Sequence, residues 1–445
     1  MVKVITYGTY DLMHYGHIRL LERAKALGDY LIVGVTSDTF DKSRGKINVQ
    51  QSLAERIEAV RATGIADEII VEEYEGQKID DIRRYGVDIF TVGSDWKGKF
   101  DYLNEFCKVI YLERTKGVSS SELRTEKRKL NIGVVGNITN MIEKFVRESK
   151  FVNGITVKGI CTESTDELTS ELKNLDICTN DFNTLAKEVD ALYLVTHPSE
   201  HYEQLKNALN MGKHILCEAP LSINSKQCDE LYSLAENNNC ILMEAIKTAY
   251  SLAFDRLRLL VKSGAIGEVV SVDAVCTSLK SDTKESIISK KKWGSMYSWG
   301  SYALLSVFSI LGTDYERKII QTRRLTENYD LFTKIDLIYK NAVATIKVGK
   351  GVKSEGDLVI SGTKGYVYVP APWWKTDYFE VRYENPQDNK RYFYQLDGEG
   401  IRYMIVSFLR SIQNGRSEGY VSSDITNKIS ELMEDFDEKK DTINI

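Results

Sequence analysis

Short apolar runs alternate with longer amphipathic stretches over the first part of the chain. The runs at residues 2–6, 31–35 (LIVGV) and 88–93 (DIFTVG) have the length and composition of buried strands. The stretches at 17–27 and 52–63 have the spacing of helices. Strands that alternate with helices in this way indicate a parallel, doubly wound α/β sheet.

A second α/β pattern begins at NIGVVGN (131–137). It follows the polar, charged stretch SSSELRTEKRKL (119–130), which suits a terminal helix and a linker. The next apolar runs are GITVKGIC (154–161), ALYLVTHP (191–198) and KHILCEAP (213–220). We therefore predict a second domain built on a parallel sheet.

From about residue 269 the pattern becomes rich in β-strands, as in VVSVDAV (269–275), KIDLIYK (334–340), AVATIKV (342–348) and GYVYV (365–369). A chain of 445 residues is also too long for one core. We therefore expect three domains, at 1–128, 129–250 and 251–445.

Composition and charge narrow the functional classes. The formal net charge of −5 gives no basic surface for nucleic acid. The seven cysteines form no CxxC pair and have no histidine at metal-ligand spacing, so we expect reduced thiols and no protein-side metal site. No apolar run approaches the length of a membrane span, and the opening residues lack a signal-peptide pattern. These features predict a cytoplasmic protein without membrane insertion.

The segment from Gly8 to His17 (GTYDLMHYGH) carries the strongest chemical signal. A strand and a turn place His14 and His17 at the start of a helix, three residues apart and on one face. A helix N-terminus offers free N–H groups and a positive dipole end to phosphate oxygens. Two imidazoles directed at the same point could stabilise a phosphate as charge builds on it, and Gly16 leaves room for a nucleotide. Capping or core histidines are the plainer alternative.

Residues 1–128 resemble the HxGH nucleotidyltransferases, and in particular the glycerol-3-phosphate cytidylyltransferase family. The resemblance rests on HYGH (14–17), LLERAKALGDYLIVGV (20–35), GSDWKGKFDYL (93–103) and RTKGVSSS (114–121). HxGH alone also fits adenylyltransferases, whereas the last two segments are typical of the cytidylyl branch. The resemblance implies that CTP and a polyol phosphate yield a CDP-polyol and pyrophosphate, with Mg²⁺, for polymers of the teichoic-acid or capsule type.

The resemblance also assigns site residues. Four would act in catalysis: His14, His17, Lys46 and Arg114. The nucleotide would contact Gly8, Thr9, Tyr10, Asp11, Gly16, Gly93, Asp95, Thr115, Gly117, Ser119, Ser120 and Ser121. Arg44 and Lys78 match positions that hold the polyol phosphate, although the family shows lysine where Arg44 stands. Because arginine is a planar fork and lysine a point charge, this departure could shift the choice of acceptor.

Other acceptors stay open, namely phosphocholine, phosphoethanolamine and a longer alditol phosphate. A choline site needs aromatic rings around the quaternary ammonium. Tyr10, Tyr15, Tyr74 and Trp96 could supply them, so the aromatic content does not exclude choline. The match to the glycerol branch favours glycerol 3-phosphate.

Residues 131–445 resemble the Gfo/Idh/MocA oxidoreductases. The segments that carry this resemblance lie at 190–222, 242–269 and 356–374. The family implies a Rossmann domain that binds NAD(P), followed by an α/β domain with a large open, mostly antiparallel sheet. Members often form dimers through this sheet, so a homo-oligomer is expected.

Several chemical positions of that family are altered. The turn after the first strand keeps Gly136, followed by Asn137, but it has Ile138 and Met141 at the other two glycine positions. The family's Glu-Lys-Pro motif reads Glu218-Ala219-Pro220, and alanine cannot transfer a proton. Both acids of a later helix motif are absent, while its tyrosine stays. The candidate residues of this module are Gly136, Asn137, Thr196, His197, His201, Glu218 and Tyr302.

Two interpretations of the second module follow. In the first it is a working NAD(P)-dependent polyol (phosphate) dehydrogenase or reductase, with Tyr302 or Lys247 as a substitute acid. In the second it is non-catalytic and binds a sugar or nucleotide, or serves in oligomerisation. The second is preferred because the lysine and both acids are missing together. A regulatory or scaffolding role for the whole chain is disfavoured by the phosphate-handling groups of the first domain.

Overall fold

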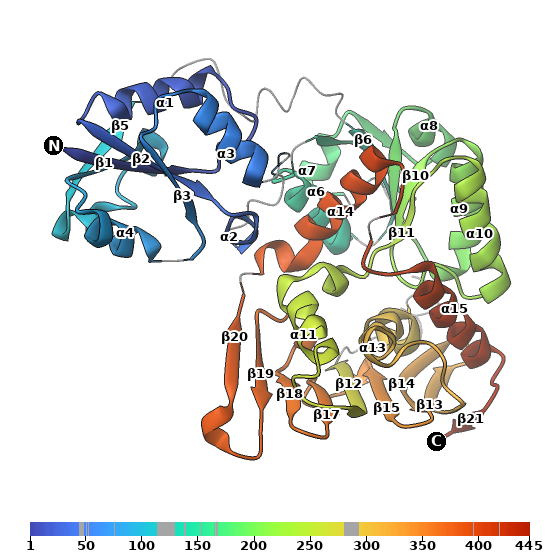
Figure 1. The fold of residues 1–445 in the computed structure, drawn as a ribbon. Helices are drawn as coiled ribbons and strands as arrows, with labels where there is room; N and C mark the ends of the chain where they lie inside the picture. Colours follow the sequence, from blue (N-terminus) through green and yellow to red (C-terminus); the bar gives the residue numbers. More distant parts are fainter. Residues whose placement is uncertain are drawn as a thin grey trace. The chain divides into compact units, whose positions relative to one another are not determined.

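The computed structural model describes residues 1–43, 49, 51, 53–74, 76–113, 130–137, 139–152, 154–163, 165, 168–279, 293–394, 396–417 and 419–445. The chain divides into two compact units, residues 1–129 and 130–445. Each unit is described by itself (Figure 1).

The first unit is a five-stranded parallel sheet with the order β3-β2-β1-β4-β5. Its strands are β1 (Lys3–Gly8), β2 (Tyr30–Thr36), β3 (Glu68–Glu72), β4 (Ile89–Gly93) and β5 (Lys108–Leu112). Its helices are α1 (Tyr15–Lys25), α2 (Asp38–Ser43), α3 (Leu53–Ala62) and α4 (Gln77–Tyr85), with the 3₁₀ segments η1 (Ser94–Trp96) and η2 (Asp101–Glu105).

Alternating side chains of these strands enter two separate cores. Val4 packs with Leu21 of α1 and Val60 of α3 on one face of the sheet. Its neighbour Ile5 packs with Ile82 of α4 on the other face. Because both faces are covered, the strands read as continuous apolar runs, which is the pattern of a parallel sheet.

The second unit begins with a six-stranded parallel sheet of order β11-β10-β9-β6-β7-β8. Its strands are β6 (Leu130–Gly136), β7 (Ile155–Cys161), β8 (Ile177–Thr179), β9 (Ala191–Val195), β10 (His214–Cys217) and β11 (Leu242–Glu244). The connecting helices are α6 (Thr139–Ser149), α7 (Ser170–Lys173), α8 (Phe182–Lys187), α9 (Pro198–Asn210) and α10 (Ser225–Asn237).

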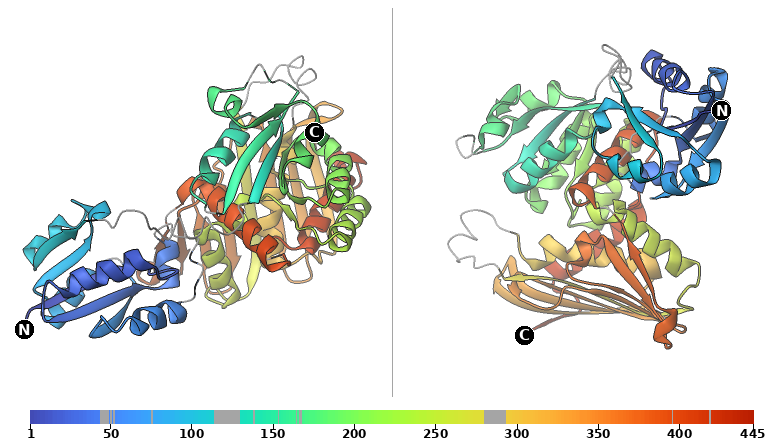
Figure 2. Two further views of the ribbon diagram at one scale, coloured as in Figure 1. Left: turned by 90° about the horizontal axis from the view of Figure 1, so that it is seen from above. Right: turned by 90° about the vertical axis from the view of Figure 1, so that its left-hand side faces the viewer.

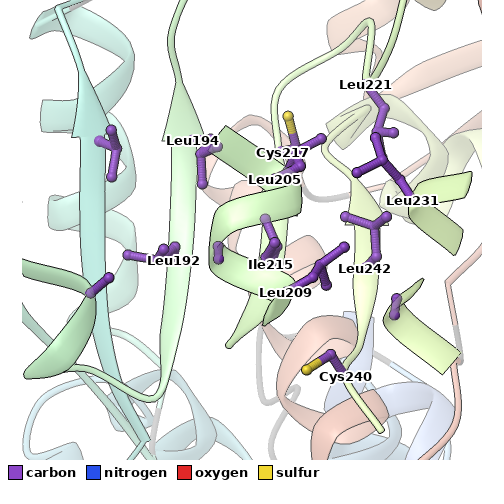
Figure 3. Packing of buried hydrophobic residues seen from close by; sticks show 14 of the residues in the cluster. Leu192, Leu194, Leu205, Leu209, Ile215, Cys217, Leu221, Leu231, Cys240 and Leu242 are labelled. Carbon is purple, nitrogen blue, oxygen red and sulfur yellow. The ribbon is translucent and has the colours of Figure 1, made fainter. Parts of the chain in front are cut away.

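The core between this sheet and α8, α9 and α10 consists of aliphatic side chains and four cysteines, with aromatic rings packed at its margin. Leu192 and Leu194 of β9 and Ile215 of β10 pack against Leu205 of α9 and Leu231 of α10 (Figure 3). All five side chains are fully buried. This packing fixes the strand ends at which a Rossmann sheet presents its ligand site.

A ten-stranded, mostly antiparallel sheet follows. Its path is β20-β19-β18-β17-β12-β15-β14-β13-β21, and β16 pairs with β12 off this path. The two parallel pairs on the path are β12 with β15 and β13 with β21. The strands are β12 (Val269–Leu279), β13 (Arg317–Thr326), β14 (Tyr329–Ile338), β15 (Val343–Gly349), β16 (Gly351–Val352), β17 (Leu358–Gly362), β18 (Tyr366–Val369), β19 (Tyr378–Arg382), β20 (Lys390–Phe393) and β21 (Thr442–Asn444).

The helices of this part are α11 (Leu252–Lys262), α13 (Ser295–Leu311), α14 (Ile401–Asn414) and α15 (Ser423–Asp437). The long apolar helix α13 lies along β12, β14 and β15 on one face of the sheet (Figures 1 and 2). The predicted fold class is confirmed: two doubly wound parallel sheets and one large, mostly antiparallel sheet.

The structure adds details that the pattern missed. Strands β3, β5, β8, β11, β13, β16 and β19–β21 were not predicted, and Leu130 opens β6 instead of ending the linker. All seven cysteines are free thiols, as expected. Within the described part of the chain, no helix combines the length and apolar character needed to cross a membrane.

Candidate functional site

The principal candidate site lies where the strand order of the first sheet reverses, between β1 and β4. These strands are parallel neighbours and end at Gly8 and Gly93. In open α/β sheets, ligands bind beyond the carboxyl ends of the strands at such a switch point. A Cβ added at Gly93 would meet no atom within 4 Å. The glycine is therefore not needed for packing, and it leaves space above the strand end.

The turn after β1 is held in an uncommon backbone conformation. Tyr10 has φ 55° and Leu12 has φ 50°, although neither is glycine. The buried Tyr10 ring folds over Gly8, where a Cβ would lie 3.0 Å from two ring carbons. Positive φ at residues other than glycine costs energy and is concentrated at functional sites. The turn is therefore a candidate ligand clamp.

His14 and His17 are brought together at the N-terminus of α1. His14 is the N-cap, and its Nδ1 accepts the backbone N–H of Gly16 at 3.0 Å. A nitrogen that accepts carries no proton, so the proton of the neutral His14 ring lies on Nε2. The rings of His14 and His17 stack with centroids 3.9 Å apart, and His17 also meets the edge of Tyr10. The arrangement can direct N–H donors at one anion.

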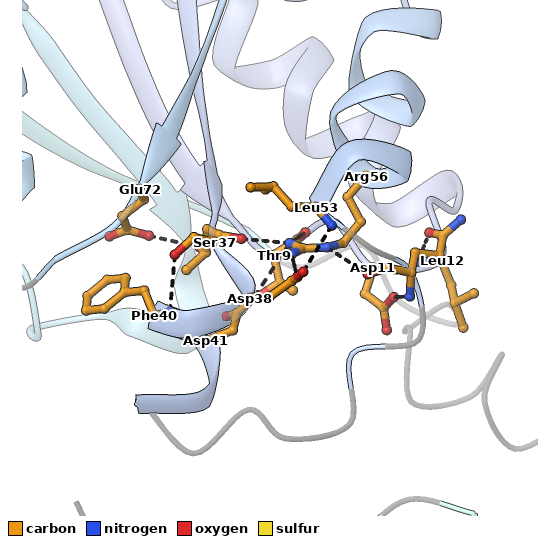
Figure 4. A network of polar contacts seen from close by, with 12 residues as sticks. Thr9, Asp11, Leu12, Ser37, Asp38, Phe40, Asp41, Leu53, Arg56 and Glu72 are labelled. Atoms are coloured by element: carbon orange, nitrogen blue, oxygen red, sulfur yellow. Dashed lines mark hydrogen bonds and ion pairs between the residues drawn. The ribbon is translucent and has the colours of Figure 1, made fainter. Parts of the chain in front are cut away.

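Arg56 of α3 holds the turn after β1 in place through hydrogen bonds and ion pairs. It is fully buried and donates to the carbonyls of Thr9 at 2.7 Å, Thr36 at 2.8 Å and Gln51 at 3.1 Å (Figure 4). Its guanidinium also pairs with carboxylates of α2, those of Asp38 and Asp41. A planar fork suits this set because its donors point to different sides.

Sequence reasoning missed Arg56, although a signal was present. Leu53, Arg56, Ile57 and Val60 follow the spacing of the apolar face of α3, so a charged residue stands where a core residue is expected. A buried charge needs partners, and those partners here are the strand ends and turn that form the site.

Thr9 and Asp11 are tied to neighbouring loops. The Thr9 hydroxyl donates to Asp41 Oδ1 at 2.9 Å, while Asp11 Oδ1 accepts the backbone N–H of Gln51 at 3.0 Å. The Gln51 side chain in turn accepts the N–H of Leu12 at 2.7 Å. These bonds hold both strained residues of the turn in place.

Lys78 lies near the strand ends but is engaged by the protein. It is buried, and its ammonium pairs with the buried Glu72 carboxylate. Glu72 also accepts the Thr36 hydroxyl at 2.9 Å, and the ammonium lies 4.7 Å from the centre of the Tyr7 ring. Asp95 stands in η1, directly after Gly93 and Ser94.

The other predicted residues of the first domain lie outside the described residues. They are Arg44, Lys46, Arg114, Thr115, Gly117, Ser119, Ser120 and Ser121. Among the residues described, no group of three or more histidine, cysteine or acidic side chains is arranged to hold a metal ion.

The second module has its own switch point between β6 and β9. Gly136 has φ 145°, and a Cβ there would lie 2.2 Å from the carbonyl oxygen of Val195. Asn137 bridges to the end of β7, where its Oδ1 accepts the Thr162 hydroxyl at 2.6 Å and its Nδ2 donates to Glu163 at 3.3 Å. Gly136 is thus required by strand packing itself.

Glu218 lies beside the position of the missing lysine. It is buried and accepts the Tyr193 hydroxyl. Burial raises the pKa of Glu218 to about 7, against the opposing effects of Tyr193 and Lys247. Burial and the Glu218 carboxylate raise the pKa of Tyr302 well above its ordinary value. Ala219 contributes no proton-transfer group beside Glu218.

The histidines of the second module differ in exposure. His201 is fully buried, and its ring nitrogens lie 2.9 Å from the Pro220 carbonyl oxygen and 3.1 Å from that of Thr196. Burial lowers the pKa of His201 to about 4. No part of this ring reaches the surface to meet a ligand. His197 instead caps α9, with its ring at the edges of Trp293 and Tyr297.

Comparisons with known proteins bear on both units. Residues 5–126 match the family described as cytidylyltransferase-like, and residues 130–246 match the oxidoreductase family with an NAD-binding Rossmann fold. A glycerol-3-phosphate cytidylyltransferase of Bacillus spizizenii is 48% identical over 130 residues, which are 29% of this chain and 100% of that protein.

The second unit has more distant relatives. A trans-1,2-dihydrobenzene-1,2-diol dehydrogenase of Oryctolagus cuniculus is 26% identical over 250 residues, covering 54% of this chain and 76% of that protein. A 3-ketoreductase from Actinomadura kijaniata, solved with NADP and TDP-benzene, shares the fold. Its TM-score is 0.63 at 16% identity, over 72% of this chain and 99% of that one.

The chain therefore belongs to the glycerol-3-phosphate cytidylyltransferase family through residues 5–126, and it joins this nucleotidyltransferase domain to an oxidoreductase domain of the Gfo/Idh/MocA family.

Proposed function

We propose that residues 1–129 transfer CMP from CTP to a small polyol phosphate, with glycerol 3-phosphate as the preferred acceptor. The stacked pair of His14 and His17 at the start of α1 carries this proposal, because it directs N–H donors to the switch point of a parallel sheet. The similarity to glycerol-3-phosphate cytidylyltransferases supports the choice of acceptor.

In the proposed reaction, a phosphate oxygen of the acceptor bonds to the α-phosphorus of CTP. The bond from that phosphorus to the bridging oxygen breaks, and its electrons leave with pyrophosphate. Catalysis of such a transfer needs positioning and charge neutralisation more than covalent chemistry. His14, through Nε2–H, and His17 would donate to the oxygens that gain charge, aided by the dipole of α1. Mg²⁺ would neutralise charge on the triphosphate.

Release of pyrophosphate from the full-length protein tests the proposal. Glycerol 3-phosphate, phosphocholine and phosphoethanolamine are compared at equal concentrations, each with CTP and, as a control, with ATP. We expect the highest kcat/KM with CTP and glycerol 3-phosphate. Turnover that prefers ATP would contradict the cytidylyl assignment, and a higher kcat/KM with either amine ester would contradict the acceptor.

For the second module we propose a ligand-binding role without the proton relay of its family. Ala219 replaces the family's lysine, and Lys247, the amine that acts on Glu218, is itself bonded to Glu399 at 2.6 Å. These residues do not fit the proton transfer that accompanies hydride transfer to a nicotinamide cofactor. An active dehydrogenase is the alternative.

Fluorescence titrations with NADH and NADPH test whether the module binds a dinucleotide, and an assay of NAD⁺ reduction separates the two roles. The Glu163 carboxylate stands at the end of β7, where an acidic side chain accepts from a ribose hydroxyl and repels a 2′-phosphate. If a dinucleotide binds, NADH is therefore expected to bind more tightly than NADPH. Reduction of NAD⁺ by a polyol or polyol phosphate would contradict the non-catalytic role.

A further inference from the structure

Three lysines of the second unit converge on one glutamate, and one of them, Lys247, is the amine that also acts on Glu218. Lys144 comes from α6, Lys247 from the 3₁₀ segment η4 (Lys247–Tyr250) and Lys375 from η5 (Trp373–Lys375). Their ammonium groups lie 3.1, 2.6 and 2.9 Å from the carboxylate oxygens of Glu399. Three elements that are far apart in the sequence thus each place a lysine ammonium group beside the same carboxylate.

The cluster carries more positive than negative charge. Three ammonium groups face one carboxylate, which leaves an excess of two positive charges among the four residues. The neighbouring Glu148 does not offset it, because it already pairs with Arg402 at 2.6 Å. The ammonium groups repel one another, so a cluster with excess positive charge favours the entry of an anion.

Partial burial strengthens these interactions. The Lys247 side chain is only 16% exposed. Burial lowers the pKa of Lys247, against the effect of Glu399, while Lys375 and Lys144 act in the same direction as burial. Burial alone would raise the pKa of Glu399, but its bonds to Lys247 and Lys375 hold that pKa at about 2. Glu399 is therefore an anion at neutral pH, and it is held by the three lysines.

The backbone is shaped to place this carboxylate. Gly398, Glu399 and Gly400 have φ of 60°, 55° and 88°. A Cβ at Gly398 would lie 2.2 Å from Glu148 Oε2, and one at Gly400 would lie 2.7 Å from the Lys247 carbonyl oxygen. Both glycines are needed because the backbone here lies close to Glu148 and to the Lys247 carbonyl. Glu399, between them, adopts an unfavourable backbone conformation.

We propose that Lys144, Lys247 and Lys375 bind the dianionic phosphate group of a small phosphorylated ligand, and that the Glu399 carboxylate occupies this position when the ligand is absent. Once Glu399 has left, a phosphate dianion offsets two of the three lysine charges, one more than the carboxylate does, and it accepts charge-assisted hydrogen bonds from several donors at once. Binding displaces Glu399 from the lysines. This site does not depend on the transfer reaction of residues 1–129.

Isothermal titration calorimetry on the full-length chain tests the proposal, with inorganic phosphate and glycerol 3-phosphate titrated separately at constant ionic strength. Glu399→Gln removes the competing charge, and Lys247→Met with Lys375→Met removes two donors. Glu230→Gln and Lys206→Met are matched controls, because they alter an exposed pair on α9 and α10 of the same unit. Residues 1–129 are identical in all variants, so their heats cancel in the comparison.

We expect phosphate to bind about tenfold more tightly to Glu399→Gln and at least about tenfold more weakly to the double lysine variant, with both controls like the wild type. If inorganic phosphate binds more tightly than glycerol 3-phosphate, the ligand is a free phosphate ion. If glycerol 3-phosphate binds more tightly, the ligand is a phosphate ester. The proposal is overturned if Glu399→Gln binds neither anion more tightly than Glu230→Gln does. Because this variant keeps all three lysines, the test stands even if the double variant does not fold.

Discussion

Replacement of Arg56 by methionine should destabilise the first domain and disable its site together. The variant leaves the carbonyls of Thr9, Thr36 and Gln51 and the buried Asp41 without their cation. Removing one partner of a buried ion pair costs about 3–5 kcal/mol. Such a loss is a large fraction of the stability of a small domain, so we expect the open population of residues 1–129 to rise by about 10²- to 10⁴-fold.

Arg56→Lys separates charge from geometry. Lysine keeps the positive charge, but a single ammonium cannot reach acceptors on different sides of the site as a guanidinium does. We expect a smaller loss of about 2 kcal/mol, from the unsatisfied carbonyls. The Thr9 carbonyl is among those acceptors, so the turn that leads to His14 should loosen and kcat with CTP should fall at temperatures where the domain stays folded.

Hydrogen–deuterium exchange of peptides from β1 and β2 in the full-length protein measures the opening of this domain, and pyrophosphate release measures its activity. Arg61→Met is the control, because Arg61 lies on the same helix, is 60% exposed in its side chain and pairs with Glu58. If Arg56→Met exchanged at the rate of Arg61→Met and turned over CTP normally, the assigned role of the buried arginine would be wrong.

Three further substitutions test separate parts of the structure. Gly8→Ala should raise KM for CTP in pyrophosphate-release assays, because the new Cβ meets the Tyr10 ring at 3.0 Å, and an unchanged KM would contradict the clamp. Gly136→Ala should lower the melting temperature of the second unit, since its Cβ would lie 2.2 Å from a carbonyl oxygen at φ 145°, and unchanged melting would contradict it. Burial raises the pKa of Glu244 from 4.5 to about 7, so the folded protein keeps a proton that the unfolded chain releases between these values. The stability from that proton is full below pH 4.5 and is lost as pH rises through 7, a change of about 3 kcal/mol. Glu244→Gln should remove this change when melting is compared at pH 5 and pH 8, and equal pH dependence in both proteins would refute it.

The sequence was sufficient to predict the fold class, because the apolar periodicity and the motifs of the two families indicate the same α/β architecture. Runs such as LIVGV are buried on both faces of a parallel sheet, so they are easily recognised. Strands such as β13 (RKIIQTRRLT) were missed because they alternate with charged residues at the surface of an antiparallel sheet. The HxGH segment predicted that His14 and His17 would share one helix face, and their rings stack there.

Contacts between distant segments were beyond sequence reasoning. Glu399 carries no motif, and its three lysines come from α6, η4 and η5, so only the folded chain brings them together. Lys78 was predicted from a family position, but its burial against Glu72 depends on the adjoining β3 and α4. Nothing in the local pattern distinguishes such a lysine from a solvated one.

The direct test of the central claim is the rate of pyrophosphate release by His14→Ser and His17→Ala. Serine can still cap α1 but is too short to reach a phosphate, so His14→Ser removes donation while keeping the helix start. Loss of one preorganised donor to the developing charge should lower kcat by about 100- to 1,000-fold, with hydrogen exchange of α1 unchanged. Wild-type turnover in either variant would contradict the claim that these imidazoles stabilise the phosphates of CTP.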